Sequence, residues 1–253
     1  MCHMSYPPGG SIGYIVGRNL ELKNPHKGEK SMITQVYGIT SIEDALGSIA
    51  AGADYIGIGV RSDGVSFEKC RDIFNAVGDK AVKVAILDFV FHNEDDVLKA
   101  AEELKPDILH LSGSVTTSKA FFERFRKTLP DMKLMQAVPV SGPEAIALAE
   151  ERMRYADYLL LDSVAHGGAI GATGASHDVT IDAEIVKRSI IPVIIAGGLG
   201  PDNVAEAIRI ARPFGVDTLS KTSINGSRFY GKDLNKVRLF CKNARKAAEE
   251  LGL

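Results

Sequence analysis

Three apolar runs between residues 158 and 220 decide the fold. They are Tyr158-Leu-Leu-Leu-Asp-Ser163, Pro192-Val-Ile-Ile-Ala196 and Gly215-Val-Asp-Thr-Leu-Ser220. The first continues into a glycine-rich loop at residues 166–174, and the second into Gly-Gly-Leu-Gly at residues 197–200. Short buried strands separated by helical segments are typical of parallel α/β proteins, which bind ligands at the carboxyl ends of their strands. We therefore expect the functional site just past these three strands.

The glycines that follow these strands predict an anion-binding site. Glycine lets backbone amides approach a ligand closely, and the amino-terminus of a following helix adds roughly half a positive charge. Gly197 and Gly198 alone are equally compatible with a simple tight turn between a strand and a helix. Because Ser220 is expected to end the next strand, the two loops together favour a phosphate site.

From Met32 onward, apolar runs of strand length alternate with longer segments of helical period. The expected strands are residues 33–37, 55–60, 81–89, 108–111, 134–138, 158–161 and 193–196, and a last strand that ends at Ser220. Eight strands that alternate with helices predict a (β/α)8 TIM barrel as a single domain, residues 32–253. An open doubly wound sheet is the alternative.

Residues 1–31 are expected to form an N-terminal extension. They are rich in glycine, proline, lysine and asparagine and show no sustained period. Such a segment is expected to pack on the outside of the barrel or on a partner subunit, so a homodimer is one expected state.

Composition and charge limit the expected partners. The chain of 253 residues has a net charge of −2, which provides no field for nucleic acid or an anionic membrane. Its three cysteines, Cys2, Cys70 and Cys241, are widely spaced and lack a metal-ligand pattern, which indicates reduced thiols and a cytoplasmic location. No apolar run has the length of a membrane helix. We expect a phosphorylated small-molecule ligand and neither a metal nor a cofactor.

Several segments share the pattern of one enzyme family. They are Tyr37-Gly-Ile-Thr40, Glu43-Asp-Ala45, Ala50-Ala-Gly-Ala-Asp54, Leu160-Leu-Asp-Ser163, Gly167-Gly168, Pro192-Val-Ile-Ile-Ala-Gly-Gly-Leu199, Asn203-Val-Ala-Glu-Ala-Ile208, Gly215-Val-Asp217, Ser220 and Lys232-Asp. Residues 32 to about 248 thereby resemble the phosphoribosylanthranilate isomerases. The resemblance implies an Amadori rearrangement of a phosphorylated ribosyl amine. That reaction needs a general acid, a general base and a phosphate-binding site.

The resemblance also implies roles for individual residues. Asp162, at the end of the sixth strand, matches the family's general acid. Gly197, Gly198 and the residues from Ser220 onward match its phosphate-binding amides, and Gly167 and Gly168 match a loop that assists them. Lys221 is expected to pair with the phosphate or to form a Schiff base.

Other positions depart from the family pattern. Tyr37 replaces the cysteine that serves as general base, and a phenol with a pKa near 10 is a poor base at neutral pH. The family's arginine after the second strand has no counterpart in Ser62-Asp-Gly-Val-Ser66, although Arg61 lies nearby. Gln136 occupies a position where the family has a lysine. We expect Tyr37 in the catalytic site and Arg61 and Gln136 in contact with the substrate.

The residues themselves suggest further catalytic candidates. Asp162 and Asp88 lie in apolar strands, where a carboxylate is costly to bury unless it is paired or used. Asp162 is otherwise a cap for the following loop, and Asp88 faces outward if the third strand shifts by one residue. His110 is equally compatible with a proton carrier and a packed core histidine.

Two other functions remain open at this point. One is a lyase or epimerase on another phosphosugar, which uses a Schiff base on Lys221 or the group Asp162, Asp88 and His110. The other is a phosphosugar-binding barrel without catalysis, since the family's base is absent.

Overall fold

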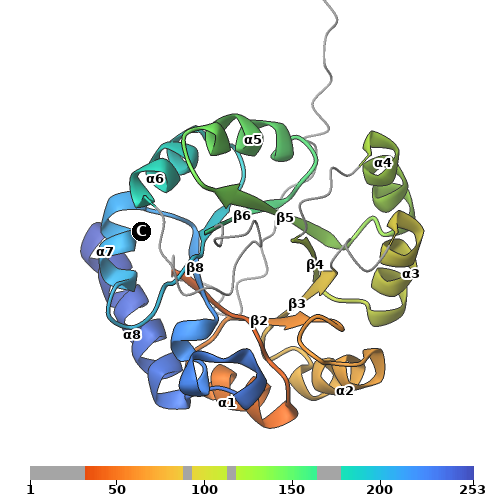
Figure 1. Ribbon diagram of the computed structural model, residues 1–253, viewed down its shortest axis with the longest axis horizontal. Helices are drawn as coiled ribbons and strands as arrows, with labels where there is room; N and C mark the ends of the chain where they lie inside the picture. Colours follow the sequence, from red (N-terminus) through yellow and green to blue (C-terminus); the bar gives the residue numbers. More distant parts are fainter. Residues whose placement is uncertain (1–31, 88–92, 113–117, 164–177) are drawn as a thin grey trace, which may run out of the picture.

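Eight parallel strands form a closed barrel in chain order, and the helices surround it (Figure 1). This computed structural model describes residues 32–87, 93–112, 118–163 and 178–253. The strands are β1 (Ile33–Val36), β2 (Tyr55–Gly59), β3 (Val82–Leu87), β4 (Ile108–Leu111), β5 (Lys133–Val140), β6 (Tyr158–Ser163), β7 (Val193–Ile195) and β8 (Gly215–Thr218). The predicted TIM barrel is confirmed.

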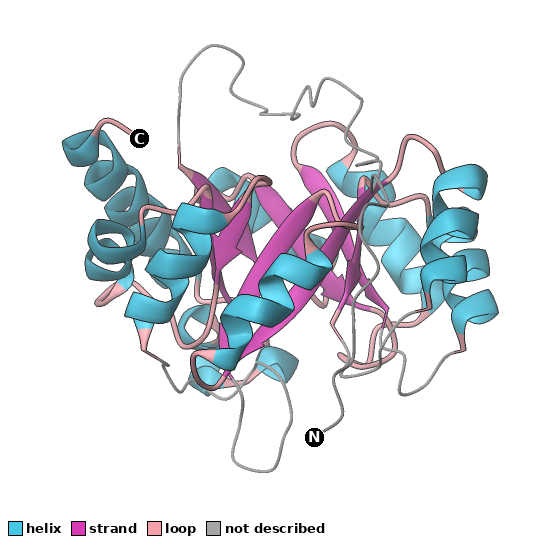
Figure 2. Ribbon diagram, turned by 90° about the horizontal axis from the view of Figure 1, so that it is seen from above, coloured by secondary structure: helices cyan, strands magenta, loops and turns pink. Residues whose placement is uncertain are grey.

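Each strand is followed by a helix on the outside of the barrel (Figure 2). The helices are α1 (Ile42–Ala50), α2 (Phe67–Val77), α3 (Glu94–Leu104), α4 (Lys119–Thr128), α5 (Glu144–Arg152), α6 (Val179–Arg188), α7 (Val204–Ala211) and α8 (Leu234–Leu251). Three short 3-10 turns, η1 (Ser220–Thr222), η2 (Ile224–Gly226) and η3 (Arg228–Tyr230), connect β8 to α8. No helix in the described part of the chain is long and apolar enough to cross a membrane.

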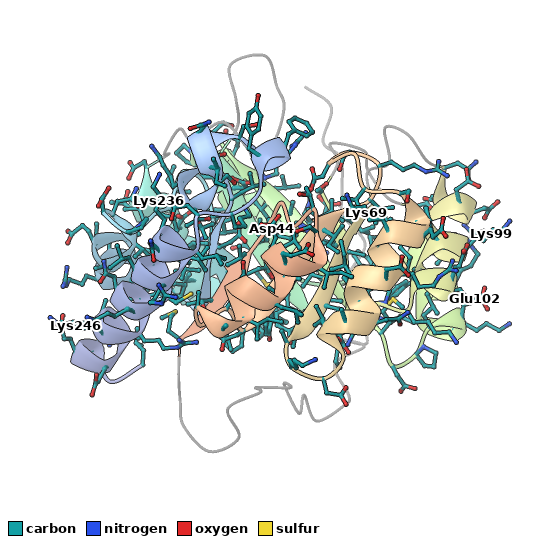
Figure 3. The ribbon with its side chains drawn as sticks, turned by 90° about the horizontal axis from the view of Figure 1, so that it is seen from below. Asp44, Lys69, Lys99, Glu102, Lys236 and Lys246 are labelled. Carbon is teal, nitrogen blue, oxygen red and sulfur yellow. The ribbon has the colours of Figure 1, made fainter. Side chains whose placement is uncertain are left out.

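Local sequence accounts for the helix boundaries. The Ser41 side chain accepts a hydrogen bond from the amide of Asp44 and so caps α1, as expected of a residue before an acidic first turn. Asp233 caps α8 in the same way. Lys236 and Lys246 of α8 lie on the outer surface (Figure 3), while Val237, Phe240 and Ala244 of the same helix are fully buried. The charges of α8 therefore form a solvated face.

Side chains alternate between two cores along each strand. Outward side chains pack between the sheet and the helices, and inward ones fill the barrel. The inner core consists of Ile33, Tyr37, Tyr55, Val82, Val84, Ile108, Met135, Tyr158, Leu160, Ile194 and Ala196. This alternation fixes which polar residues at the strand ends face the mouth of the barrel.

The last strand ends earlier than expected. β8 stops at Thr218, and Ser220 begins the turn η1, so the prediction that Ser220 ends the strand is wrong. The hydroxyls of Thr222 and Ser223 both donate hydrogen bonds to the carbonyl oxygen of Leu219, and this bends the chain. These hydrogen bonds stabilise a turn where the apolar pattern alone would extend the strand.

Candidate active site

The carboxyl ends of the strands bring polar side chains from four strands together at the mouth of the barrel. Asp162 of β6 has the same inward parity as Tyr158 and Leu160, and Asp217 of β8 is paired in register with Gln35 of β1. His110 of β4 is paired in register with the inward-facing Met135. The mouth therefore contains titratable groups that an apolar barrel would otherwise exclude.

Tyr37, the first residue after β1, reaches across the mouth to His110. Its hydroxyl oxygen lies 2.5 Å from Nδ1 of His110, and the two rings are 5.5 Å apart. The tyrosine ring lies over Gly57 of β2, where a Cβ atom would be 1.9 Å from the ring. The missing side chain at residue 57 thus makes room for the contact between Tyr37 and His110.

Burial keeps both rings of this pair uncharged. It raises the pKa of Tyr37 well above the ordinary value, and the nearby carboxylate of Asp217 adds to the rise. Burial also lowers the pKa of His110 to about 3. Nε2 of His110 is buried and has no hydrogen-bond partner among the described residues. The pair therefore consists of a neutral phenol and a neutral imidazole with one nitrogen that makes no hydrogen bond to the described residues.

Asp162 and Asp217 interact across the mouth. The pKa of Asp217 is raised well above its usual range, first because the group is buried and then because of the negative charge of Asp162. Oδ1 of Asp217 has no hydrogen-bond partner in the described part of the chain. The Asp162 carboxylate accepts a hydrogen bond of 2.7 Å from the amide of Ser163. Two carboxyl groups that affect each other in this way can hold one proton between them.

The loops after β7 and β8 lie together. Gly197 and Gly198 have φ angles of 85° and 65°, which favour glycine. Asn203 holds their loop, since its Oδ1 accepts a hydrogen bond from the amide of Gly200 and its Nδ2 donates one to the carbonyl oxygen of Gly198. A Cβ atom on Gly200 would lie 2.6 Å from Cβ of the exposed Lys221. Backbone and cation thus meet on one side of the mouth.

Gln136 does not face the mouth. It is paired in register with Leu111 of β4 and Leu159 of β6, and both belong to the core between the sheet and the helices. Register partners in neighbouring strands point to the same side of a sheet. The Gln136 side chain therefore faces the helices and not the mouth, and the prediction that it contacts the substrate is wrong.

Of the remaining predicted site residues, the structure describes Arg61 but not Asp88, Gly167 or Gly168. Arg61 has a φ angle of 66°, is exposed, and holds its guanidinium 5.4 Å from the centre of the Phe67 ring. Its contact with a substrate stays a prediction. Asp88, Gly167 and Gly168 lie outside the described residues.

Sequence reasoning missed several polar residues of the mouth. From the sequence, Asp217 and Lys232 were quoted as part of the family pattern but were assigned no function. Asp63 and Arg228 were also assigned no function. Lys232 is 5% exposed, and its Nζ donates hydrogen bonds to Ser223 Oγ and the carbonyl oxygen of Leu219. Burial lowers the pKa of Lys232 to about 8. Asp217 could have been found from the alternation of the strand. Gly215 is paired in register with the inward-facing Ile33, so Asp217, two residues later, faces the inside of the barrel as well.

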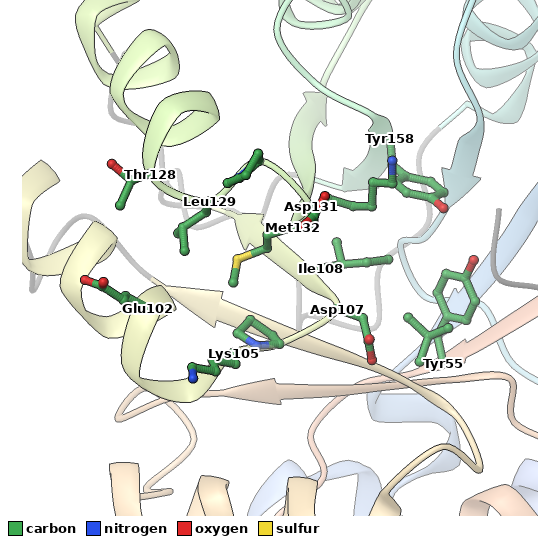
Figure 4. Close-up of a pocket in the computed structure, with 14 residues that line it drawn as sticks. Tyr55, Glu102, Lys105, Asp107, Ile108, Thr128, Leu129, Asp131, Met132 and Tyr158 are labelled. Carbon is green, nitrogen blue, oxygen red and sulfur yellow. The ribbon is translucent and has the colours of Figure 1, made fainter. Parts of the chain in front are cut away.

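A pocket of about 620 Å³ opens at the opposite end of the barrel (Figure 4). It is lined by the loops before β4 and β5 and by residues that begin strands, among them Tyr55 and Tyr158. The amino ends of barrel strands usually contribute to stability rather than to chemistry. The pocket is therefore separate from the polar mouth.

Comparison with known proteins gives a consistent result. The family model of N-(5'-phosphoribosyl)anthranilate isomerase matches residues 34–243. The isomerase of Methanocella arvoryzae is 32% identical over 83% of this chain and 97% of its own, and that of Halorubrum lacusprofundi is 34% identical over 85% and 97%. The crystal structure of the Thermotoga maritima isomerase is similar with a TM-score of 0.70 and 26% identity, over 85% of this chain and 99% of that one.

The match spans every strand of the barrel except the first residue of β1, and it includes both glycine loops and the polar mouth. It also spans the positions at which this chain carries Tyr37 and Asp63. On the extent of the family match and the identity to these relatives, the chain belongs to the phosphoribosylanthranilate isomerase family.

Proposed function

We propose that this protein catalyses an Amadori-type aldose–ketose rearrangement of a phosphorylated ribosyl amine. N-(5'-phosphoribosyl)anthranilate, the compound for which its relatives are named, is the first candidate substrate. The observation that carries the proposal is the position of Asp162. Within a family-matched barrel, this carboxylate faces the mouth at the end of β6 and interacts with Asp217.

In this reaction a proton is donated to the ring oxygen, the ring opens, and a proton leaves carbon 2. We assign the first donation to Asp162. Burial and the neighbouring charge of Asp162 raise the pKa of Asp217 well above its usual range, which favours a proton on this pair of carboxyl groups. Ring opening and the return of a proton to carbon 1 then need no group from outside the mouth.

We assign to His110, positioned by Tyr37, the role of a neutral hydrogen-bonding group, because a pKa of about 3 makes it a poor base near neutral pH. The base is then the carboxylate that Asp162 becomes once it has protonated the ring oxygen. The Tyr37 hydroxyl keeps its proton because burial raises its pKa, so it does not act as the base itself. Nδ1 of His110 lies 2.5 Å from that hydroxyl. In the tautomer with the proton on Nδ1, this nitrogen donates to the tyrosine oxygen and Nε2 is left as a hydrogen-bond acceptor.

The phosphate is assigned to the backbone amides after β7 and β8. Gly197 and Gly198 both have positive φ angles in the loop after β7, and η1 begins one residue after the end of the neighbouring strand β8. Lys221 adds a positive charge beside them. Gly167 and Gly168 remain predicted contributors to this site.

Replacement of Gly198 by alanine is expected to weaken binding of ribose 5-phosphate about tenfold or more. The φ angle of 65° strains any other residue by about 1 kcal/mol and turns the amide away from the ligand. Gly252→Ala is the matched control, since Gly252 has a φ of 66° at the end of α8. The affinity is measured by calorimetry. Equal affinities for the two variants would contradict the phosphate assignment.

The other functions considered have no observation in their favour among the described residues. Lys221 is exposed, whereas a lysine that forms a Schiff base is usually desolvated. Asp88, which belongs to the second alternative group, lies outside the described part of the chain.

We further propose a homodimer and a cytoplasmic location. The dimer is supported by the related isomerase of Thermotoga maritima, which is dimeric and from which monomers have been generated. The location is supported by the cysteine pattern, since Cys70 and Cys241 are buried free thiols.

The proposed function is tested by turnover of phosphoribosylanthranilate. The compound is made in situ, and loss of its fluorescence is followed after addition of the purified protein. Turnover that is proportional to protein concentration is the expected result. A folded protein that binds ribose 5-phosphate but leaves the fluorescence unchanged would contradict it.

A further inference from the structure

An ion pair connects two loops across the mouth of the barrel. Nε of Arg228, in η3, lies 3.2 Å from Oδ1 of Asp63, in the loop after β2. Nη2 of Arg228 donates a hydrogen bond of 3.3 Å to the carbonyl oxygen of Ser62, and Asp63 accepts a second hydrogen bond from the amide of Gly59. Residues far apart in the chain thus fix one guanidinium at the rim.

The same arginine lies beside Gly38, the residue that follows Tyr37. A Cβ atom on Gly38, the residue after Tyr37, would be 3.1 Å from Cβ of Arg228. The charge of Asp63 also affects the pKa of Tyr37, which places the ion pair within electrostatic reach of the phenol. The Arg228 backbone therefore passes close to the end of β1, and its guanidinium lies against the loop after β2.

The contacts of Arg228 leave part of its guanidinium unused. The group has five N–H donors, and the contacts with Asp63 and Ser62 use one on Nε and one on Nη2. Nη1 has no hydrogen-bond partner in the part of the chain that the structure describes. The Phe229 ring lies 5.2 Å from the guanidinium, and the side chain is 30% exposed. Its orientation is therefore fixed while one edge remains available to a ligand.

The proposed substrate brings two anionic groups, a phosphate and the carboxylate of its aromatic ring. The phosphate is assigned to the loops after β7 and β8, where Lys221 lies. Lys232 is buried against Ser223 and the carbonyl oxygen of Leu219. The loop after β2 carries the carboxylate of Asp63 and the exposed guanidinium of Arg61, so Arg61 and Arg228 are the two candidates for the second cation. Of the two, Arg228 is held in place by an ion pair with Asp63 and a hydrogen bond to Ser62.

We propose that Arg228, positioned by Asp63, binds the carboxylate of the aromatic ring of the substrate. The inference rests on the proposed function and names the residue that selects the substituent on the ribosyl amine. A planar guanidinium binds a carboxylate through two parallel hydrogen bonds, and a fixed orientation reduces the entropy lost on binding. The cation is thus supplied by the loop after β8, on the far side of β1 from the loop after β2.

Binding of a nonreacting ligand pair tests this inference without requiring turnover. One probe is reduced 1-(o-carboxyphenylamino)-1-deoxyribulose 5-phosphate, a compound seen bound to a related isomerase. The second is its counterpart without the ring carboxylate. Calorimetry gives the Kd of each probe for the unchanged protein and for Arg228→Met. The variant is expected to bind the carboxylated probe about 10- to 100-fold more weakly and the other probe unchanged.

Two further variants make the result specific. Arg238→Met removes an exposed arginine of α8 and is expected to change neither Kd. Arg61→Met tests the arginine that belongs to the loop after β2 itself. A selective loss for the carboxylated probe in Arg61→Met, and none in Arg228→Met, would overturn the inference. An equal loss for both probes in Arg228→Met would also overturn it, because the arginine would then support the loop and not the carboxylate.

The test is independent of the proposed activity. A protein that turns over phosphoribosylanthranilate but shows no selective loss in Arg228→Met retains the proposed function and loses this inference. A protein that shows the selective loss without turnover retains the binding role and loses the proposed reaction.

Discussion

Asp162→Asn is expected to lower kcat about 100- to 10,000-fold, the usual contribution of a general acid. The amide side chain can still accept the hydrogen bond that the Ser163 amide now donates to the carboxylate, so the end of β6 should keep its conformation. It has no acidic proton to give to the ring oxygen. The measurements are kcat, the affinity for ribose 5-phosphate and the midpoint of thermal unfolding.

Asp202→Asn is the matched control for this variant. Asp202 is exposed before α7, at the same end of the barrel, and its replacement should leave kcat unchanged. Near-normal turnover in Asp162→Asn would remove this residue from the mechanism. If Asp162→Asn lost both turnover and its affinity for ribose 5-phosphate, the substitution would disturb the phosphate-binding loops and not specifically the proton transfer.

Gly57→Ala is expected to destabilise the protein by about 3 kcal/mol, at the upper end of what overpacking of a core usually costs. The new methyl carbon would lie 1.9 Å from the nearest carbon of the Tyr37 ring. The ring is buried in the inner core, so it cannot move aside without displacing its neighbours. Displacement of the ring would also break the contact with His110. The free energy of unfolding is measured by denaturant titration.

A double-mutant cycle with Tyr37→Ala separates this steric cause from others. In the Tyr37→Ala background, Gly57→Ala should cost about 0.5 kcal/mol or less, because the ring that it clashes with is gone. Glycine inside a strand otherwise destabilises it relative to alanine. The same cost for Gly57→Ala in both backgrounds would contradict the steric explanation.

The architecture was largely predictable from local patterns. Alternating strand and helix periods indicated the barrel. The end of β8 was not predictable in this way. It depends on hydrogen bonds from Thr222 and Ser223 to the carbonyl oxygen of Leu219, and the apolar pattern carries no sign of them.

The site was only partly predictable, for a related reason. Asp162 and His110 stood out because polar residues in apolar strands are costly to bury. The role inferred for Arg228 depends on contacts with Asp63 and with Ser62, the latter 166 residues away in the chain. Gln136 shows the opposite error, since a position shared with a family does not settle which face of the strand a side chain occupies.

The most direct test of the proposed isomerase is proton NMR of phosphoribosylanthranilate incubated with the protein in D₂O. The account predicts that the ketose product appears and that its carbon 1 carries deuterium, because the carboxyl groups and the imidazole of the mouth exchange their protons with solvent. The Asp162→Asn variant should form the same product at a far lower rate. A folded protein that binds ribose 5-phosphate but yields no ketose would contradict the account.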